Sequence, residues 1–438
     1  MQFHILSFEG PDSYSRVGGL ATRVEGLAQT LASLGFETHL WFVGDPDRPG
    51  QEVRGCLHLH RWLQWVSRHH ANGVYDGEQS KVPEYARTVA PRLVEDWLAP
   101  YLASGGHGVV LAEEWQTVDA LHHVAWLLER AGLRDRAALL WNANNTFGFD
   151  SIDWPRLARA ARVTTVSRYM KQRMWTHGVD PLVIPNGLPG DAFEPPDRIA
   201  GGVLRERFRD RMVLVKMARW DPDKRWLEAI EAVAAMKRMG LRPLLIARGG
   251  WEPYGAEVLT AMRAFGLVRA DRAWSGSGPE GLLSALRDLA GADVIHLRSH
   301  VDADARRVLL NGADAVLANS AHEPFGLVGL ETMAAGGLAC TGATGEDYAV
   351  PGRNAIVLET GDPGELVGWL DRLRARPAEA RSIRRAGRDT ARLFDWRDVV
   401  ERVLLPRAEL GLGPASGDGR RRPPLARVAA RPALEEAS

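Results

Sequence analysis

The 438-residue sequence has few cysteines, no excess of charge of one sign and no long apolar run. Only Cys56 and Cys340 occur, far apart in the chain, which excludes a disulfide framework and leaves no cysteine spacing typical of a metal site. Lys plus Arg equals Asp plus Glu, so the basic excess of nucleic-acid-binding proteins is missing and we expect no nucleic-acid partner. Since no stretch of about 18 apolar residues occurs, we expect no transmembrane segment.

The N-terminus is typical of a β-strand and not of a signal peptide. Residues 1–8 contain no basic segment and only a short apolar run. The sequence therefore favours a cytoplasmic protein. At roughly 100–200 residues per domain, the length predicts two domains and a tail.

Strand and helix patterns alternate along both halves of the chain. The segment 3–8 predicts a strand, Gly18 and Gly19 a loop, the following apolar residues at helical spacing a helix, and 38–43 a second strand. The same alternation restarts after a polar, proline-containing stretch at 189–200. We therefore predict an α/β fold of two facing, doubly wound, Rossmann-like domains, with a ligand in the cleft between them.

The strongest motif is the run His322-Glu-Pro-Phe-Gly-Leu-Val-Gly-Leu-Glu-Thr-Met-Ala-Ala-Gly336. A predicted strand ends at Asn319 and a predicted helix begins near Gly326. Glu323 then lies in the loop above the strand end, and Glu331 about two turns into the helix. Backbone N–H groups at the helix start can bind a phosphate, and carboxylates can accept sugar hydroxyls. From the residues alone, a capped helix with an exposed acid explains the run equally well.

This run resembles the E-x7-E motif of the retaining family 4 glycosyltransferases, which have the GT-B fold and include bacterial relatives of glycogen synthase. The resemblance implies that Glu323 contacts the donor sugar and Glu331 the nucleotide ribose. It also implies that Phe325, Gly326 and Leu327 belong to the donor site.

Three further segments resemble the same family in the same order. Arg16-Val-Gly18-Gly19-Leu resembles a K-x-G-G-L loop whose amides approach the donor phosphates, with Arg16 in place of Lys. Ile184-Pro-Asn186-Gly resembles the hinge region, which gives Asn186 a donor contact. Arg219 and Lys224 resemble an R-x4-K pair that clamps the donor diphosphate.

The resemblance covers about residues 1–400 and implies the domain limits. We expect an N-terminal acceptor-side domain at 1–190 and a C-terminal donor domain at 201–393. A helix at 394–410 is expected to cross back onto the first domain, and 411–438 to form a disordered tail.

The sequence departs from the family at three places. The usual first-domain histidine is missing, and Asn142 or Asn144 occupies its place. Glu114 replaces an aspartate that contacts the sugar, and Glu346 follows Gly345 where a second glycine is usual. These changes leave the identity of the sugar open.

The expected function is that of a retaining glycosyltransferase that moves a hexose, glucose in the first instance, from a UDP-, ADP- or GDP-sugar to a sugar, glucan or other hydroxyl acceptor. Arg219, Lys224 and Glu323 are the expected catalytic residues. Glu114, Asn142 and Asn144 are expected on the sugar or acceptor side. No cofactor or metal is implied, because cationic side chains can stabilise the leaving diphosphate. Two alternatives remain: a GT-B phosphorylase or trehalose-type synthase, and a non-catalytic nucleotide-sugar-binding protein.

Overall fold

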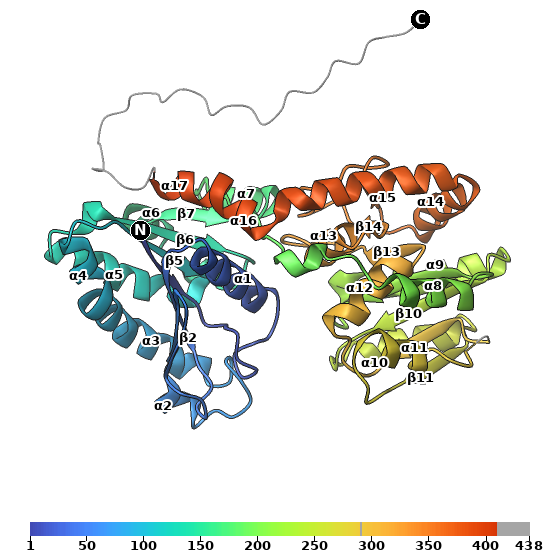
Figure 1. Cartoon of the computed structure of the whole chain (residues 1–438), viewed down its shortest axis with the longest axis horizontal. Helices are drawn as coiled ribbons and strands as arrows, with labels where there is room; N and C mark the ends of the chain where they lie inside the picture. The colour runs from blue at the N-terminus through green and yellow to red at the C-terminus, as the bar shows by residue number, and fades with distance from the viewer. Residues whose placement is uncertain (290, 410–438) are drawn as a thin grey trace, which may run out of the picture.

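The computed structural model describes residues 1–289 and 291–409, which form two α/β domains lying side by side (Figure 1). The tail predicted at 411–438 lies outside the described residues. Each sheet is covered by helices on both faces, with a separate apolar cluster on either side. Strands buried on both faces must be apolar almost throughout, and all five residues of the first strand are buried.

The first domain contains an eight-stranded sheet in the order β3-β4-β2-β1-β5-β6-β7-β8, in which only β3 runs antiparallel to its neighbour. Its strands are β1 (Gln2–Leu6), β2 (Glu37–Val43), β3 (Gln51–Arg54), β4 (Leu57–Trp62), β5 (Gly108–Glu113), β6 (Ala137–Ala143), β7 (Arg162–Thr165) and β8 (Leu182–Val183). Its helices are α1 (Gly19–Ser33), α2 (Gln64–Ser67), α3 (Glu78–Leu93), α4 (Ala99–Ala103), α5 (Val118–Arg130), α6 (Trp154–Ala160) and α7 (Arg168–Trp175).

The second domain contains a seven-stranded parallel sheet in the order β11-β12-β10-β9-β13-β14-β15. Its strands are β9 (Met212–Met217), β10 (Pro243–Arg248), β11 (Arg269–Arg272), β12 (Val294–Leu297), β13 (Ala315–Ala318), β14 (Ala339–Thr341) and β15 (Ile356–Val357). Its helices are α8 (Arg198–Arg207), α9 (Trp226–Arg238), α10 (Gly255–Ala264), α11 (Gly278–Ala285), α12 (Ala303–Gly312), α13 (Leu327–Ala334), α14 (Pro363–Ala375) and α15 (Pro377–Ala391).

The strand order reverses at β1 in the first sheet and at β9 in the second, which are the positions where such sheets bind ligands. The predicted fold class is therefore confirmed. Two local predictions were wrong. Because α13 begins at Leu327, Glu331 lies about one turn into the helix, not two. The sequence also predicts a helix at 224–239, but the helix begins at Trp226, after a short 3-10 turn at Pro222–Lys224.

The C-terminal segment returns to the first domain. After α15 on the second domain, α16 (Trp396–Val399), a π-helical turn at Val400–Leu404 and α17 (Leu405–Glu409) run along the first domain (Figure 1). Trp396 is fully buried in the same apolar cluster as Leu20 and Val24 of α1. A Cβ on Gly26 would lie 2.3 Å from Trp396 Nε1, so the close approach requires glycine at position 26. Among the described residues, no helix is long and apolar enough to cross a membrane.

Candidate active site between the two domains

An ion pair in the second domain brings two of the predicted residues together. Lys224 ends the 3-10 turn that follows β9, and Arg225 next to it has a left-handed backbone (φ +49°). Lys224 Nζ lies 2.5 Å from Glu323 Oε2, and each side chain is about one-fifth exposed. The backbone strain at Arg225 fixes Lys224 at the strand end, where ligand contacts are expected.

A third residue, the acidic Glu346, which the sequence shows only as a departure from the family, completes this cluster. The carboxyl of Glu346 is buried, and within the described part of the chain neither of its oxygens has a hydrogen-bond partner. A Cβ on Gly326 would lie 2.6 Å from Glu346 Cγ, so Glu346 fills the space beside the start of α13. Burial, and then the charge of Glu323, hold the pKa of Glu346 well above its usual range. Burial therefore disfavours the charged form of Glu346 beside the Lys224–Glu323 ion pair.

The start of α13 offers an anion site. Gly326 caps the helix with φ +74°, and Tyr348 donates its hydroxyl to the Gly326 carbonyl. The first N–H groups of a helix have no partner within it and favour negative charge. One turn on, Glu331 pairs with Arg306 at 3.2 Å, and burial raises the pKa of the Glu331 carboxyl. Phe325 is buried against the rings of Tyr348 and Phe394, and this packing supports the loop that precedes α13.

The glycine loop of the first domain meets this helix start. A Cβ on Gly19 would lie 4.0 Å from Leu327 Cδ1, which brings the loop and α13 together across the domain boundary. The amides of Val17, Gly18 and Ala21 donate to the Glu9 carboxylate at 3.3, 3.1 and 3.1 Å. Glu9 thus holds the glycine loop in place through contacts within the first domain. The motif does not indicate this role of Glu9. Arg16 pairs with Glu25 on the surface.

Three asparagines predicted to face the substrate belong to one buried network. Glu113 accepts hydrogen bonds from Arg23, Asn142 and Asn144 at 3.0, 2.8 and 2.7 Å. Arg23 also donates to Asn186 Oδ1 at 2.7 Å. The side chain of Asn142 is fully buried and its oxygen accepts from Thr164, so it braces Glu113 and does not face the cleft.

Glu114 lies directly after β5 and is conformationally strained. Its φ is +69°, outside the range that non-glycine residues favour, and such strain is concentrated at functional sites. The carboxylate accepts a hydrogen bond from the Asn144 amide at 2.6 Å, and burial raises the pKa of Glu114 to about 8. The side chain is thus a neutral acid over most of the physiological range.

Arg219 lies in the loop between β9 and the 3-10 turn that ends at Lys224. Its side chain is 67% exposed and pairs with Asp221 at 3.7 Å. Beside it, a pocket of about 290 Å³ opens at the carboxyl ends of β9, β10 and β12, lined among others by Trp220, Arg248, Trp251 and Arg298. Sequence reasoning missed this pocket, although the run Arg248-Gly-Gly-Trp directly after a strand could have indicated it. A larger pocket of about 560 Å³ lies between α6 and β8 and includes none of the motif residues.

Comparison with known families agrees with this geometry. A model described as Glycosyltransferase Family 4 matches residues 17–190, and one described as Glycosyl transferases group 1 matches residues 242–375. The chain belongs to the glycosyltransferases. Both matches contain motif residues, Gly18 and Gly19 in the first and Glu323 and Glu331 in the second.

Two relatives illustrate how this glycosyltransferase compares in sequence. It is 26% identical over 260 residues to a D-inositol 3-phosphate glycosyltransferase from Thermomonospora curvata, covering 49% of this chain and 60% of the relative. It is also 26% identical over 434 residues to a glycogen synthase from Thermus thermophilus, covering 88% and 95% of the two chains. The chain thus spans about three fifths of the first relative and nearly all of the second.

Solved structures share the fold of this glycosyltransferase. Sucrose-phosphate synthase from Thermosynechococcus elongatus superposes with a TM-score of 0.62 at 19% identity, covering 94% of this chain and 99% of that one. HepE from Anabaena, in complex with UDP and glucose, gives a TM-score of 0.61 at 16% identity and covers 93% and 100%. At these identities the likeness establishes the GT-B fold and not the substrates.

Proposed function

We propose that this chain is a retaining glycosyltransferase that moves a hexose from a nucleotide-sugar donor to a hydroxyl acceptor. The observation that carries the proposal is the meeting of three features at one place. The Lys224–Glu323 pair and the start of α13 form a site for an anion and a sugar, and the glycine loop of the first domain adjoins it. Such an arrangement suits a diphosphate with a sugar attached.

The donor diphosphate is bound by Lys224, Arg219 and the first amides of α13. As the bond between the anomeric carbon and the diphosphate breaks, negative charge grows on the departing oxygen, and these groups stabilise it. The sugar carbon gains oxocarbenium character. The acceptor oxygen bonds to that carbon on the face that the diphosphate leaves, and its proton passes to the departing phosphate oxygen. Substitution on one face retains the anomeric configuration.

The two glutamates of the motif have different partners in this proposal. Glu323, beside Lys224, accepts hydrogen bonds from hydroxyls of the transferred sugar. Glu331, one turn into α13 and 15% exposed, accepts them from the ribose. Glu114 and Asn144 bind the sugar from the first domain, while Asn142 and Asn186 hold Glu113 and Arg23 in position.

A UDP-sugar is the first donor to test, and UDP-glucose in particular. HepE, which shares the fold, binds UDP and glucose. The pocket beside Arg219 suits a nucleobase, because Trp251 is 80% exposed and Arg298 lies 5.4 Å from the centre of its ring. Aromatic and guanidinium planes are the groups on which bases stack.

A donor screen followed by product analysis tests the proposal. Thermal shift with UDP-, ADP- and GDP-glucose identifies the donor, since a ligand at 100 times its Kd stabilises the protein by about 2.7 kcal/mol. Release of nucleoside diphosphate in the presence of sugar acceptors, with an α-linked product by proton NMR, supports a retaining transferase. Transfer of the sugar from a sugar 1-phosphate to an acceptor, with release of inorganic phosphate and no need for a nucleotide, indicates a phosphorylase instead. If the donor binds but no nucleoside diphosphate is released, whichever acceptor is present, the chain is a non-catalytic binding protein.

A further inference from the structure

Four histidines gather on one face of the first-domain sheet, away from the candidate active site. His4 lies on β1, His39 on β2, and His58 and His60 on β4, and the register pairs His4 with His39 and His39 with His58. His39 and His58 lie near the amino ends of their strands. Substrates of such sheets bind at the carboxyl ends, so the proposed glycosyl transfer does not account for this histidine row.

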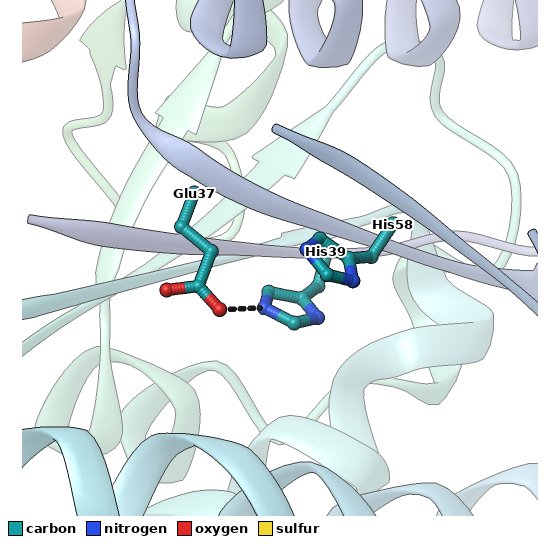
Figure 2. Close-up of side chains that lie close together, drawn as sticks. All are labelled: Glu37, His39 and His58. Atoms are coloured by element: carbon teal, nitrogen blue, oxygen red, sulfur yellow. Dashed lines mark hydrogen bonds and ion pairs between the residues drawn. The ribbon is translucent and has the colours of Figure 1, made fainter. Parts of the chain in front are cut away.

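Three side chains at this place could reach a common ion. Glu37, His39 and His58 each offer a ligand atom, and these atoms lie within 4.8 Å of one another. Figure 2 shows the Glu37 carboxylate turned toward the His39 ring, with His58 on the other side of that ring. Glu37 Oε1 lies 3.2 Å from His39 Nε2, and the rings of His39 and His58 stack at 4.5 Å. Glu37 and His58 are only partly buried, so an ion can enter from solvent.

The surroundings fit a metal ligand at His39. Its second ring nitrogen, Nδ1, lies 3.0 Å from His60 Nε2, and metal-binding histidines are usually oriented by a hydrogen bond of this kind. His60 is 2% exposed, and among the described residues its Nδ1 has no partner.

We propose that Glu37, His39 and His58 bind a divalent transition-metal ion, with Zn²⁺ as the first candidate, in a structural site that links β2 to β4. Zinc bonds of about 2.0–2.1 Å require the ligand atoms to converge to roughly 3.3 Å, with water as the fourth ligand. The partly exposed His58 and Glu37 side chains turn inward to reach this distance, while buried His39 stays in place. Two imidazoles and one carboxylate favour Zn²⁺, Ni²⁺ or Cu²⁺ over the hard cations Mg²⁺ and Ca²⁺.

Metal titration of the full chain tests the site. The chain is prepared without a histidine tag, stripped with a chelator, and titrated with Zn²⁺ against a chromophoric competitor, with Mg²⁺ in parallel. We expect one Zn²⁺ per chain, no Mg²⁺ binding, and a Zn²⁺-dependent rise in Tm on the order of 5 °C at 100 times the Kd. Co²⁺ in place of Zn²⁺ should give the visible absorption of a four-coordinate site.

Variants locate the ion. His58→Gln and Glu37→Gln should each weaken Zn²⁺ binding by at least about tenfold and abolish the rise in Tm. His69→Gln removes an exposed histidine of the same domain. This variant should change neither the Zn²⁺ affinity nor the Zn²⁺-dependent rise in Tm. The proposal is overturned if the wild-type chain does not bind one Zn²⁺ per chain. It is also overturned if His58→Gln and Glu37→Gln both bind Zn²⁺ as tightly as the wild type. Since the wild-type titration needs no substitution, misfolding of a variant does not affect that outcome.

Discussion

At the scale of single residues, the candidate active site is unusual in how many carboxyls it buries. Glu114 and Glu346 both replace residues that the family motif leads one to expect, and burial raises the pKa of both. An uncharged carboxyl can donate a hydrogen bond, which an ionised one cannot. The Lys224–Glu323 ion pair of the candidate site thus lies next to Glu346, a carboxyl whose charged form is disfavoured by burial.

Lys224 can be tested by substitution. Lys224→Ala removes a cation from the diphosphate and should lower kcat by about 10²–10³-fold, as the loss of one transition-state contact usually does. The measurement is steady-state release of nucleoside diphosphate, with circular dichroism to verify the fold. Lys237→Ala is the matched control, because Lys237 also pairs with a carboxylate, Asp293 at 2.7 Å, but lies on α9 near its end. Near-normal turnover in Lys224→Ala would show that Lys224 does not bind the leaving group.

Glu346 makes stability depend on pH in a defined direction. The pKa of the Glu346 carboxyl is near 4.5 in the unfolded chain and is raised in the folded chain. At pH values between these two pKa values, Glu346 is mostly ionised in the unfolded chain and mostly protonated in the folded one. The cost of keeping Glu346 buried therefore grows as pH rises through this window. Glu346→Gln removes that cost, so its gain in Tm over the wild type should be larger at pH 8 than at pH 5.

Thermal melts at the two pH values measure this gain. Glu231→Gln, at an exposed position of α9, should show no such difference. An equal Tm change for Glu346→Gln at both pH values would contradict a buried, neutral Glu346.

Sequence reasoning found the residues of the site that lie in short motifs, and it missed those held by long-range contacts. Lys224 and Glu323 were identified from short motifs that resemble those of the family, and they do meet in the structure. The network of Arg23, Glu113 and Asn186 joins positions 90 and 163 residues apart, and no local pattern contains that pairing. Glu9 was missed for a different reason: it lies only nine residues before Gly18, but the motif does not include it.

At the scale of elements, strands that are buried on both faces were easier to predict than the exposed edge strand β3. Strands buried on both faces give continuous apolar runs, whereas β3 is largely exposed and polar. The 16-residue α3 contains Pro83 and Pro91, which argue against a helix in the sequence. Packing outweighs this penalty, because Tyr85, Val89 and Leu93 of α3 are fully buried. Tertiary contacts of that kind cannot be derived from local preference.

The C-terminal crossing can be tested through a pair of glycines. Gly26→Ala places a methyl group against Trp396 and should destabilise the chain by about 1–3 kcal/mol, as overpacking usually does. Gly202→Ala, in α8 with no atom within 4 Å of the new Cβ, should stabilise it by up to about 1 kcal/mol. Urea denaturation measures both. A neutral Gly26→Ala would mean that Trp396 does not pack on α1 in solution.

At the scale of the whole molecule, the proposed catalysis depends on bringing two separately wound sheets to one ligand. The approach of Gly19 to Leu327 and the Arg168–Asp347 pair at 3.1 Å join the domains at the level of the donor site. Alternation of strands and helices was enough to predict two such domains. The division of the site between them came from the family resemblance, because periodicity contains no information on how two domains face each other.

The central claim is that Glu323 and Glu331 bind different parts of one nucleotide-sugar donor. Calorimetric titration of Glu323→Ala and Glu331→Ala with UDP and with UDP-glucose tests it directly. Glu331→Ala should weaken both ligands by about 1.5–3 kcal/mol, because both carry the ribose. Glu323→Ala should leave UDP affinity nearly unchanged while weakening the intact donor, because only the donor carries the sugar. Equal loss of UDP affinity in the two variants would contradict the account.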